Sequence, residues 1–113
     1  MTIKTTFIIA LLGLSLPAAA EFQTVSLAYE IALSDFRAPA SANGGVVFKE
    51  CSTCEQKSVR ATPDTSYLVN GRSLELAKFR EAVARVSDRD GTTLTVLHHL
   101  ESDTIVSIKV WIR

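Results

Sequence analysis

The sequence lacks an excess of charge of either sign. It carries 12 basic and 12 acidic residues. The first 20 residues contain one basic side chain, Lys4, and no acidic one, so their removal would leave 11 basic against 12 acidic residues. Domains that bind nucleic acid or anionic membranes normally show a basic excess or a clustered basic face. The sequence therefore predicts that neither is the partner of this protein.

Long apolar runs are also missing after residue 20, as are internal repeats and low-complexity segments. A membrane-spanning helix needs about 20 consecutive apolar residues. We therefore expect no transmembrane segment in residues 21–113. That stretch has the length of one small domain, which is just large enough to bury a core.

Catalytic motifs are equally scarce. There is no glycine-rich phosphate loop, and no serine lies in the glycine pattern of a nucleophile elbow. Asp88 and Asp90 lie close together, but in a Gly-containing stretch that is typical of a solvent-exposed loop. These absences favour a protein that is not an enzyme and has no cofactor.

The first 20 residues are organised as a secretory signal peptide. Lys4 supplies the positive charge, residues 7–16 form the apolar stretch, and Ala18–Ala20 precede Glu21. We expect cleavage near Ala20 and a periplasmic or secreted mature protein. The alternative is an uncleaved membrane anchor, but the stretch is shorter than a spanning helix needs and Pro17 interrupts its end. A lipid anchor would need a cysteine directly after the cleavage site, where Glu21 stands.

Six segments after residue 20 have the composition or the period-two alternation of strands. They are residues 25–33, 46–51, 58–62, 67–69, 94–100 and 106–112. The first could also be a short helix by its periodicity. Residues 34–45 contain Pro39 and paired glycines, so we expect a flexible loop there. Asn70-Gly71 favours a tight reversal, and Ser102-Asp103 suits a hairpin loop.

Alternation predicts which side chains share a face in the last two strands. The first face carries Leu94, Val96, His98 and Leu100. The second carries Val106, Ile108, Val110 and Ile112. Both are expected to be apolar and buried.

One amphipathic helix is expected from Ser73, a good N-cap residue, to about Val86. Helical spacing places Leu76, Phe79, Ala82, Val83 and Val86 on one face. Strands followed by one helix and a hairpin indicate an α+β domain. We expect a curved antiparallel sheet or small open barrel of about five to six strands, with the helix covering one opening.

Cys51 and Cys54 are the only cysteines of the chain. In an oxidising compartment they are expected to form a disulfide that closes a short loop and stabilises the fold by about 2 kcal/mol. A thioredoxin-like redox pair is the alternative, and it needs the first cysteine at a helix N-terminus. The residues after Cys54 instead indicate turn and strand, and the flanking Glu50 and Glu55 would raise a thiol pKa.

A metal site is the third interpretation of the cysteine pair. Cys51, Cys54 and His98 are the candidate ligands, but His99 cannot join them, because adjacent strand residues point to opposite faces. At most three ligands converge, so no metal is expected. His98 is better explained as a core histidine, and His99 as a solvated one.

Tyr67 and Trp111 are the candidate contacts for a partner. Single aromatic residues on strands more often pack in the core or along an edge. Trp111 shares the less apolar face of the last strand with Ser107, Lys109 and Arg113, so it is the better of the two candidates.

Residues 46–79 resemble small exported bacterial proteins of unknown activity. The resemblance is carried by Cys51-Ser52-Thr53-Cys54, by the stretch Val59–Thr65, by a Tyr67–Gly71 strand and turn of the pattern Y-x-V-N-G, and by the L-x-x-F pattern within Leu74–Phe79. It covers about a third of the chain, and it implies that Thr65, Asn70 and Gly71 are turn-forming, structural positions.

The sequence as a whole favours an exported, non-enzymatic domain that binds or supports another cell-envelope component. That component would be an envelope protein or a small ligand. The rival hypothesis is a thiol-redox or metal-handling protein that uses Cys51 and Cys54.

Overall fold

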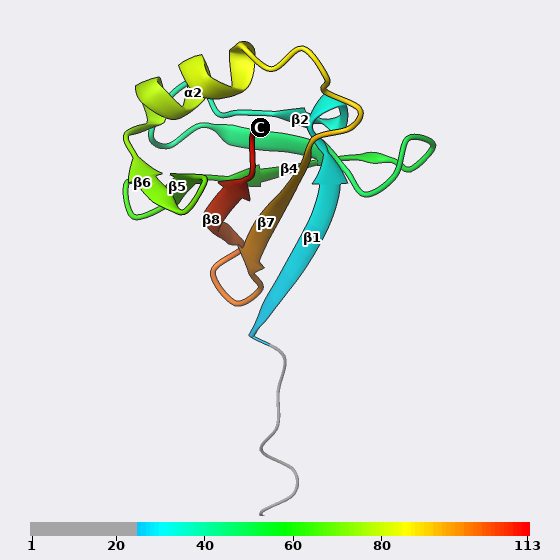
Figure 1. Ribbon diagram of the computed structural model, residues 1–113. Coiled ribbons are helices and arrows are strands. Elements are labelled where there is room, and N and C mark those ends of the chain that lie inside the picture. The colour runs from blue at the N-terminus through cyan, green and yellow to red at the C-terminus, as the bar shows by residue number, and fades with distance from the viewer. Residues whose placement is uncertain (1–24) are drawn as a thin grey trace, which may run out of the picture.

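The computed structural model describes residues 25–113, and the predicted signal peptide and cleavage position lie outside this range. Within it the chain forms eight strands, one 3-10 turn and one α-helix (Figure 1). The elements are β1 (Ser26–Ala32), η2 (Leu33–Asp35), β2 (Phe36–Arg37), β3 (Gly45–Lys49), β4 (Gln56–Arg60), β5 (Ser66–Val69), β6 (Arg72–Leu74), α2 (Leu76–Ala84), β7 (Thr93–His99) and β8 (Thr104–Val110).

The strands form one mixed sheet in the order β1-β7-β8-β4-β3-β2. The β5–β6 hairpin joins this sheet through β5, which pairs with β8. Most neighbours are antiparallel, but β8 runs parallel to both β4 and β5. The predicted α+β domain, with a curved antiparallel sheet or small open barrel of about five to six strands, was therefore wrong. The fold is mostly sheet with one short helix.

The six predicted strands correspond to β1, β3, β4, β5, β7 and β8. The two that were missed are β2 and β6, which have two and three residues. Strands this short contain too few residues to show an alternating pattern. They raise the number of strands to eight.

The parallel pairing follows from the turn between β4 and β5. The hydroxyl of Thr65 accepts a hydrogen bond from the Thr62 N–H at 2.9 Å and donates one to the Ile105 carbonyl at 2.7 Å. The chain keeps its direction through this turn, so β4 and β5 pair with β8 one after the other. Arg60 of β4 pairs with Thr104, and Ser66 of β5 pairs with Ser107. The Pro63-Asp64 pair predicted a turn but carries no information about the direction of the strand that follows.

Val106 does not lie on the predicted buried face of β8, because the strand contains a bulge. His98 pairs with Ile105 and Leu97 pairs with Ser107, which leaves Val106 as an extra residue. Val106 is 39% exposed, while Ile105 is buried in its place. Alternation resumes after the bulge, so Ile108 and Val110 are buried as predicted.

The helix begins later than predicted. Ser73 lies in β6, opposite Leu68 of β5, and the helix N-cap is Glu75 without a side-chain hydrogen bond. A strand pairing that completes the β5–β6 hairpin thus prevails over the capping preference of Ser73. The buried face is as predicted, because Phe79 and Val83 are buried and Leu76 packs against the core.

The core lies on the inner face of the curved sheet, with α2 across one end of it (Figure 1). Residues 34–45, for which a flexible loop is predicted, contain β2 and the fully buried Pro39. Aromatic rings form much of the core: Tyr67 and Phe36 contact Phe79, and Tyr29 contacts Phe48. No helix in residues 25–113 is long and apolar enough to cross a membrane.

Candidate binding surface around Trp111

The two aromatic residues predicted as partner contacts have opposite environments. Tyr67 points inward from β5 and is 5% exposed, with its ring 5.2 Å from that of Phe79. Burial raises the pKa of its phenol, and no described residue is a hydrogen-bond partner for its hydroxyl. Trp111 follows β8 and is 69% exposed. Tyr67 is therefore a core residue, and Trp111 is the one of the two that is accessible at the surface.

The backbone around Trp111 is held by Asn70. The Asn70 N–H donates to the Val110 carbonyl at 3.0 Å. Its side-chain amide donates to the Ile112 carbonyl at 3.0 Å and accepts from the Ile112 N–H at 2.7 Å. These bonds continue the β5–β8 pairing beyond the last backbone pair, Val69 and Val110. We call this arrangement the Asn70 clamp.

The clamp depends on an unusual backbone conformation. Asn70 and Gly71 have φ values of 52° and 82°, a left-handed conformation that asparagine tolerates and glycine adopts freely. The predicted tight reversal at these residues is confirmed. Atom Cη2 of Trp111 lies 3.8 Å from the point that a Cβ on Gly71 would occupy, so the indole lies beside the turn. Trp111 is therefore exposed and held by its neighbours.

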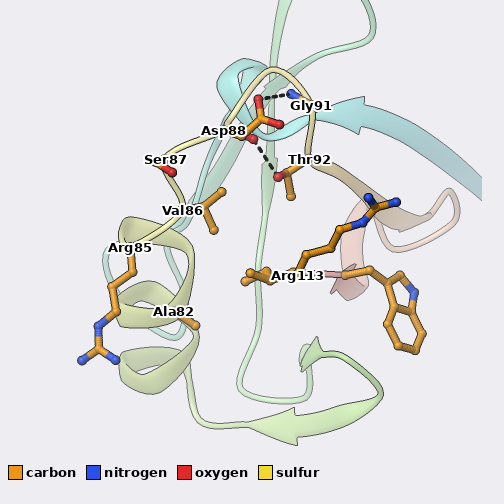
Figure 2. A pocket seen from close by; sticks show the side chains of 10 residues that line it. Ala82, Arg85, Val86, Ser87, Asp88, Gly91, Thr92 and Arg113 are labelled. Carbon is orange, nitrogen blue, oxygen red and sulfur yellow. Dashed lines mark hydrogen bonds between the residues drawn. The ribbon is translucent and has the colours of Figure 1, made fainter.

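A hollow of about 490 Å³ lies on one side of Trp111 and is drawn in Figure 2. Its wall is formed by the end of α2 and the loop that leads to β7, and Arg85 points away from it (Figure 2). The lining residues are Ala82, Arg85, Val86, Ser87, Asp88, Gly91, Thr92, Trp111, Ile112 and Arg113. Polar and apolar groups are mixed in this lining.

The loop that forms the rim of this hollow is braced internally. Asp88 accepts a hydrogen bond from the Gly91 N–H on Oδ1 at 3.1 Å, and its carbonyl accepts one from the Thr92 hydroxyl at 2.7 Å (Figure 2). A Cβ at Gly91 would lie 2.3 Å from Asp88 Oδ2, so a side chain there would displace the carboxylate. Arg89 also donates to the Val83 carbonyl at the end of α2, at 2.9 Å.

A second hollow of about 750 Å³ is also lined by Trp111 and lies over the outer face of the sheet. We define the outer face as the side of β1, β7, β8 and β5 that carries Ala28, Thr95 and Lys109. Glu30, Thr93 and Thr95 line this hollow together with Asn70. Both hollows share Gly91, Trp111, Ile112 and Arg113, and we call this shared region with its two hollows the Trp111 surface.

The cysteines lie far along the chain from this surface, in the six-residue loop that joins β3 and β4. Cys51 and Cys54 form a disulfide with a Cα–Cα distance of 5.0 Å, and the Cys54 N–H donates to the Cys51 carbonyl at 3.1 Å. The pair closes a hairpin turn between Lys49 and Gln56, and no helix begins there. The thioredoxin arrangement, with the first cysteine at a helix N-terminus, is therefore not formed.

Lys57 fixes the base of this hairpin loop. Its ammonium is 3.1 Å from a carboxylate oxygen of Glu50 and 5.0 Å from the centre of the Tyr29 ring. The hydrogen bond that the Lys57 ammonium donates to the Glu50 carboxylate raises the pKa of Lys57 above its ordinary value. The hairpin loop is thus joined by electrostatic contacts to β1.

The histidines occupy the β7–β8 hairpin. His98 Nε2 is 2.7 Å from an Asp103 carboxylate oxygen, its ring stacks near Tyr29, and its Nδ1 is buried without a partner among the described residues. His99 Nδ1 is 3.0 Å from the Ser102 hydroxyl. Across residues 25–113, no three His, Cys, Asp or Glu side chains come together in a group that could hold a metal ion.

Sequence reasoning named Trp111 as a candidate contact, and the groups that position its backbone were not predicted. Asn70 was expected only to form a turn, and Asp88 was expected to be a plain solvent-exposed residue. Asn-Gly before a short polar segment is a signal for the turn, but the bond to Ile112 spans 42 residues and has no local signature. Comparisons with protein-family models, curated proteins and solved structures found no match to this chain.

Proposed function

We propose that this protein is an exported, non-enzymatic domain that binds another cell-envelope component through the Trp111 surface. The observation that carries the proposal is an indole that is 69% exposed while its backbone is held by the Asn70 clamp. Export rests on the signal-peptide pattern of residues 1–20. The Cys51–Cys54 disulfide supports it, because disulfides persist mainly in oxidising compartments.

Trp111 has the physical properties of a binding hot spot. Tryptophan offers a large rigid area and is enriched among residues that dominate binding energies. The Asn70 clamp and the neighbouring Gly71 restrict the Trp111 segment before binding, so less conformational entropy is lost when a partner covers it.

The surroundings of the indole indicate the chemistry of the partner. The lining of the two hollows contains two basic residues, Arg85 and Arg113, and two acidic ones, Glu30 and Asp88, and Thr93 and Thr95 add hydroxyl groups. Such a surface fits a partner that places a flat or apolar group against the indole and mixed polar groups around it. It offers no single-sign field that would favour nucleic acid or an anionic membrane.

A binding experiment tests this proposal. The purified protein would be immobilised and exposed to envelope extract, and the bound components would be identified by mass spectrometry. We expect Trp111→Ala to lose at least about tenfold in retained partner, which corresponds to a hot-spot contribution above 1.4 kcal/mol. Val106→Ala removes part of an exposed apolar side chain elsewhere on β8 and serves as the matched control. Equal retention by both variants would contradict the role of Trp111.

Export and the rival redox hypothesis need a separate measurement. The intact mass of protein from the periplasmic fraction should correspond to cleavage near Ala20 and to a bonded Cys51–Cys54 pair. A cytoplasmic, uncleaved product would contradict export. Catalysed reduction of a model disulfide substrate, abolished by Cys51→Ser, would favour the thiol-redox function instead.

A further inference from the structure

Strand β1 forms one edge of the sheet. All seven of its residues pair with β7, from Ser26 opposite His99 to Ala32 opposite Thr93. No described strand pairs with its other side. In Figure 1 it is the long light-blue strand beside β7, at the margin of the sheet.

Two hydrogen bonds show which backbone groups of β1 face outward. The Val25 carbonyl accepts from the Leu100 N–H at 2.9 Å, and the Leu33 N–H donates to the Thr92 carbonyl at 2.8 Å. On the β1 side both bonds are made by odd-numbered residues, Val25 and Leu33, which continue the antiparallel register of β1 and β7. Hydrogen-bonded and non-bonded pairs alternate along such a ladder. The N–H and C=O groups of the even-numbered residues therefore point to the free edge. These residues are Ser26, Ala28, Glu30 and Ala32.

Most of the usual devices that prevent edge pairing are absent from this strand. Edge strands are normally short or interrupted by proline, lysine or a bulge. At the opposite edge of the sheet, β2 has two residues, one of them Arg37, and Pro39 follows shortly after. β1 has seven residues and a continuous ladder, with Glu30 as its one charge. The apolar side chains of Val25 and Leu27 are 56% and 41% exposed.

We propose that the free edge of β1 pairs with β1 of a second copy of this chain, antiparallel and centred on Tyr29. This register places Ser26 opposite Ala32 and Ala28 opposite Glu30, so all four outward-facing residues exchange backbone hydrogen bonds. Each bonded pair exchanges two bonds, which gives about eight across the interface. Leu27 lies opposite Ile31 of the second copy, and Val25 lies opposite Leu33.

The strand is complementary to itself in this register. Its one charge, Glu30, faces the methyl group of Ala28, so no like charges are opposed. The exposed Leu27 gains an apolar neighbour on each side of the two-fold axis, which favours strand pairing. A second copy also supplies an edge of the same length with the same unsatisfied groups, and this match is the reason for choosing it over an unrelated extended peptide.

The oligomeric state tests the interface. The full chain is expressed and the purified protein is studied by sedimentation analysis at concentrations of up to about 0.5 mM, which is high enough to detect a weak dimer. We expect the mass of a dimer. Ala28→Pro removes an N–H at the free edge but none that bonds to β7, so the fold is retained and the dimer is lost. Thermal melts confirm that the variant is folded. A monomeric wild type, or a dimer unaffected by Ala28→Pro, would overturn the proposal.

A pair of charge variants tests the register. Ala28 and Glu30 both have exposed side chains, so substitutions there leave the fold intact. Ala28→Lys places a lysine opposite Glu30 of the second copy, and the two-fold axis repeats this pair. The two pairs of opposite charge should lower the dissociation constant of the dimer by about twofold to thirtyfold. Ala28→Glu should weaken it by a similar factor, and adding Glu30→Lys should reverse that loss. A dimer weakened by Ala28→Lys would refute the register centred on Tyr29.

Discussion

The inner and outer faces of this sheet are built from the same strands but have different chemistry. On β5 and β8, Tyr67, Ile108 and Val110 point inward and are buried, while Leu68 and Lys109 point outward. The inner face is covered by α2 and by η2 with β2, which supply Leu33 and Phe36 to the core. On the outer face Ala28, Glu30 and Lys109 are exposed. Stability is therefore expected to depend on the inner face, while the outer face is available for recognition.

The largest effect is expected on the inner face, at Phe79. Phe79→Ala removes a fully buried ring that contacts Tyr67 and Phe36. The free energy of unfolding should fall by about 3 to 5 kcal/mol through lost burial and a residual cavity. Denaturant melts measure this change. Lys78→Ala, the neighbouring solvent-exposed position, is the control and should change it by less than about 0.5 kcal/mol. Equal denaturation midpoints for the two variants would contradict the assignment of the Phe79 side of α2 as the side that packs against the sheet.

The β3–β4 hairpin loop belongs to neither face and should show an intermediate effect. Replacing both cysteines, Cys51→Ser with Cys54→Ser, removes the constraint that the disulfide places on the unfolded chain. We expect a loss of about 1 to 3 kcal/mol with the fold intact, measured by the same melts and by circular dichroism. Unfolding of the double variant at ambient temperature would show that the disulfide organises more than a turn.

Tyr67 gives the inner face a dependence on pH. Burial raises the pKa of its phenol above the ordinary value of 10.0. The unfolded chain therefore loses the phenol proton first as pH rises, and this favours unfolding. The contribution is fully present below about pH 10 and is lost as pH rises through the folded-state value.

Tyr67→Phe should reduce this alkaline loss of stability. At neutral pH it should leave the unfolding free energy unchanged or raise it by up to about 1 kcal/mol, because it removes a buried hydroxyl that has no partner among the described residues. Melts at pH 7 and above pH 10 compare the two proteins. A strongly destabilised variant at pH 7 would indicate that the hydroxyl is bonded, for example to buried water.

The smallest effect on stability is expected on the outer face. Trp111→Ala should change the unfolding free energy by less than about 0.5 kcal/mol, because the indole is mostly exposed. The same substitution is expected to weaken partner binding. A loss of several kcal/mol would mean that the ring supports the fold, and the contrast between the two faces would then disappear.

The sequence contained much of the local structure but little of the long-range pairing. Alternation located the strands around Val59, Val96 and Ile108, and the Asn70-Gly71 dipeptide located a turn, because these patterns depend on neighbouring residues. The parallel direction of β5 depends on a hydrogen bond between Thr65 and Ile105, which are 40 residues apart. No local pattern encodes such a contact.

Parts of the candidate surface were beyond sequence reasoning for the same reason. Tyr67 and Trp111 are both aromatic residues in or beside short strands, and only the arrangement of the sheet buries one and exposes the other. The bulge at Val106 likewise depends on how β8 matches β7. The helix N-cap was predicted two residues too early, at Ser73 instead of Glu75, because Ser73 is both a good cap and an acceptable strand residue.

The Asn70 clamp has a consequence for the chemical ageing of this protein. Asparagine is among the heat-labile residues, and an asparagine followed by glycine loses its side-chain amide with particular ease, because the next backbone nitrogen can attack it. Conversion of Asn70 to an acid would replace the NH₂ group that donates to the Ile112 carbonyl with an oxygen. Two acceptors would then face each other, and the segment that carries Trp111 would be held less firmly, by the bonds to the Val110 carbonyl and from the Ile112 N–H alone. An aged sample is thus expected to keep its fold and its buried aromatic core, while the position of Trp111 is altered.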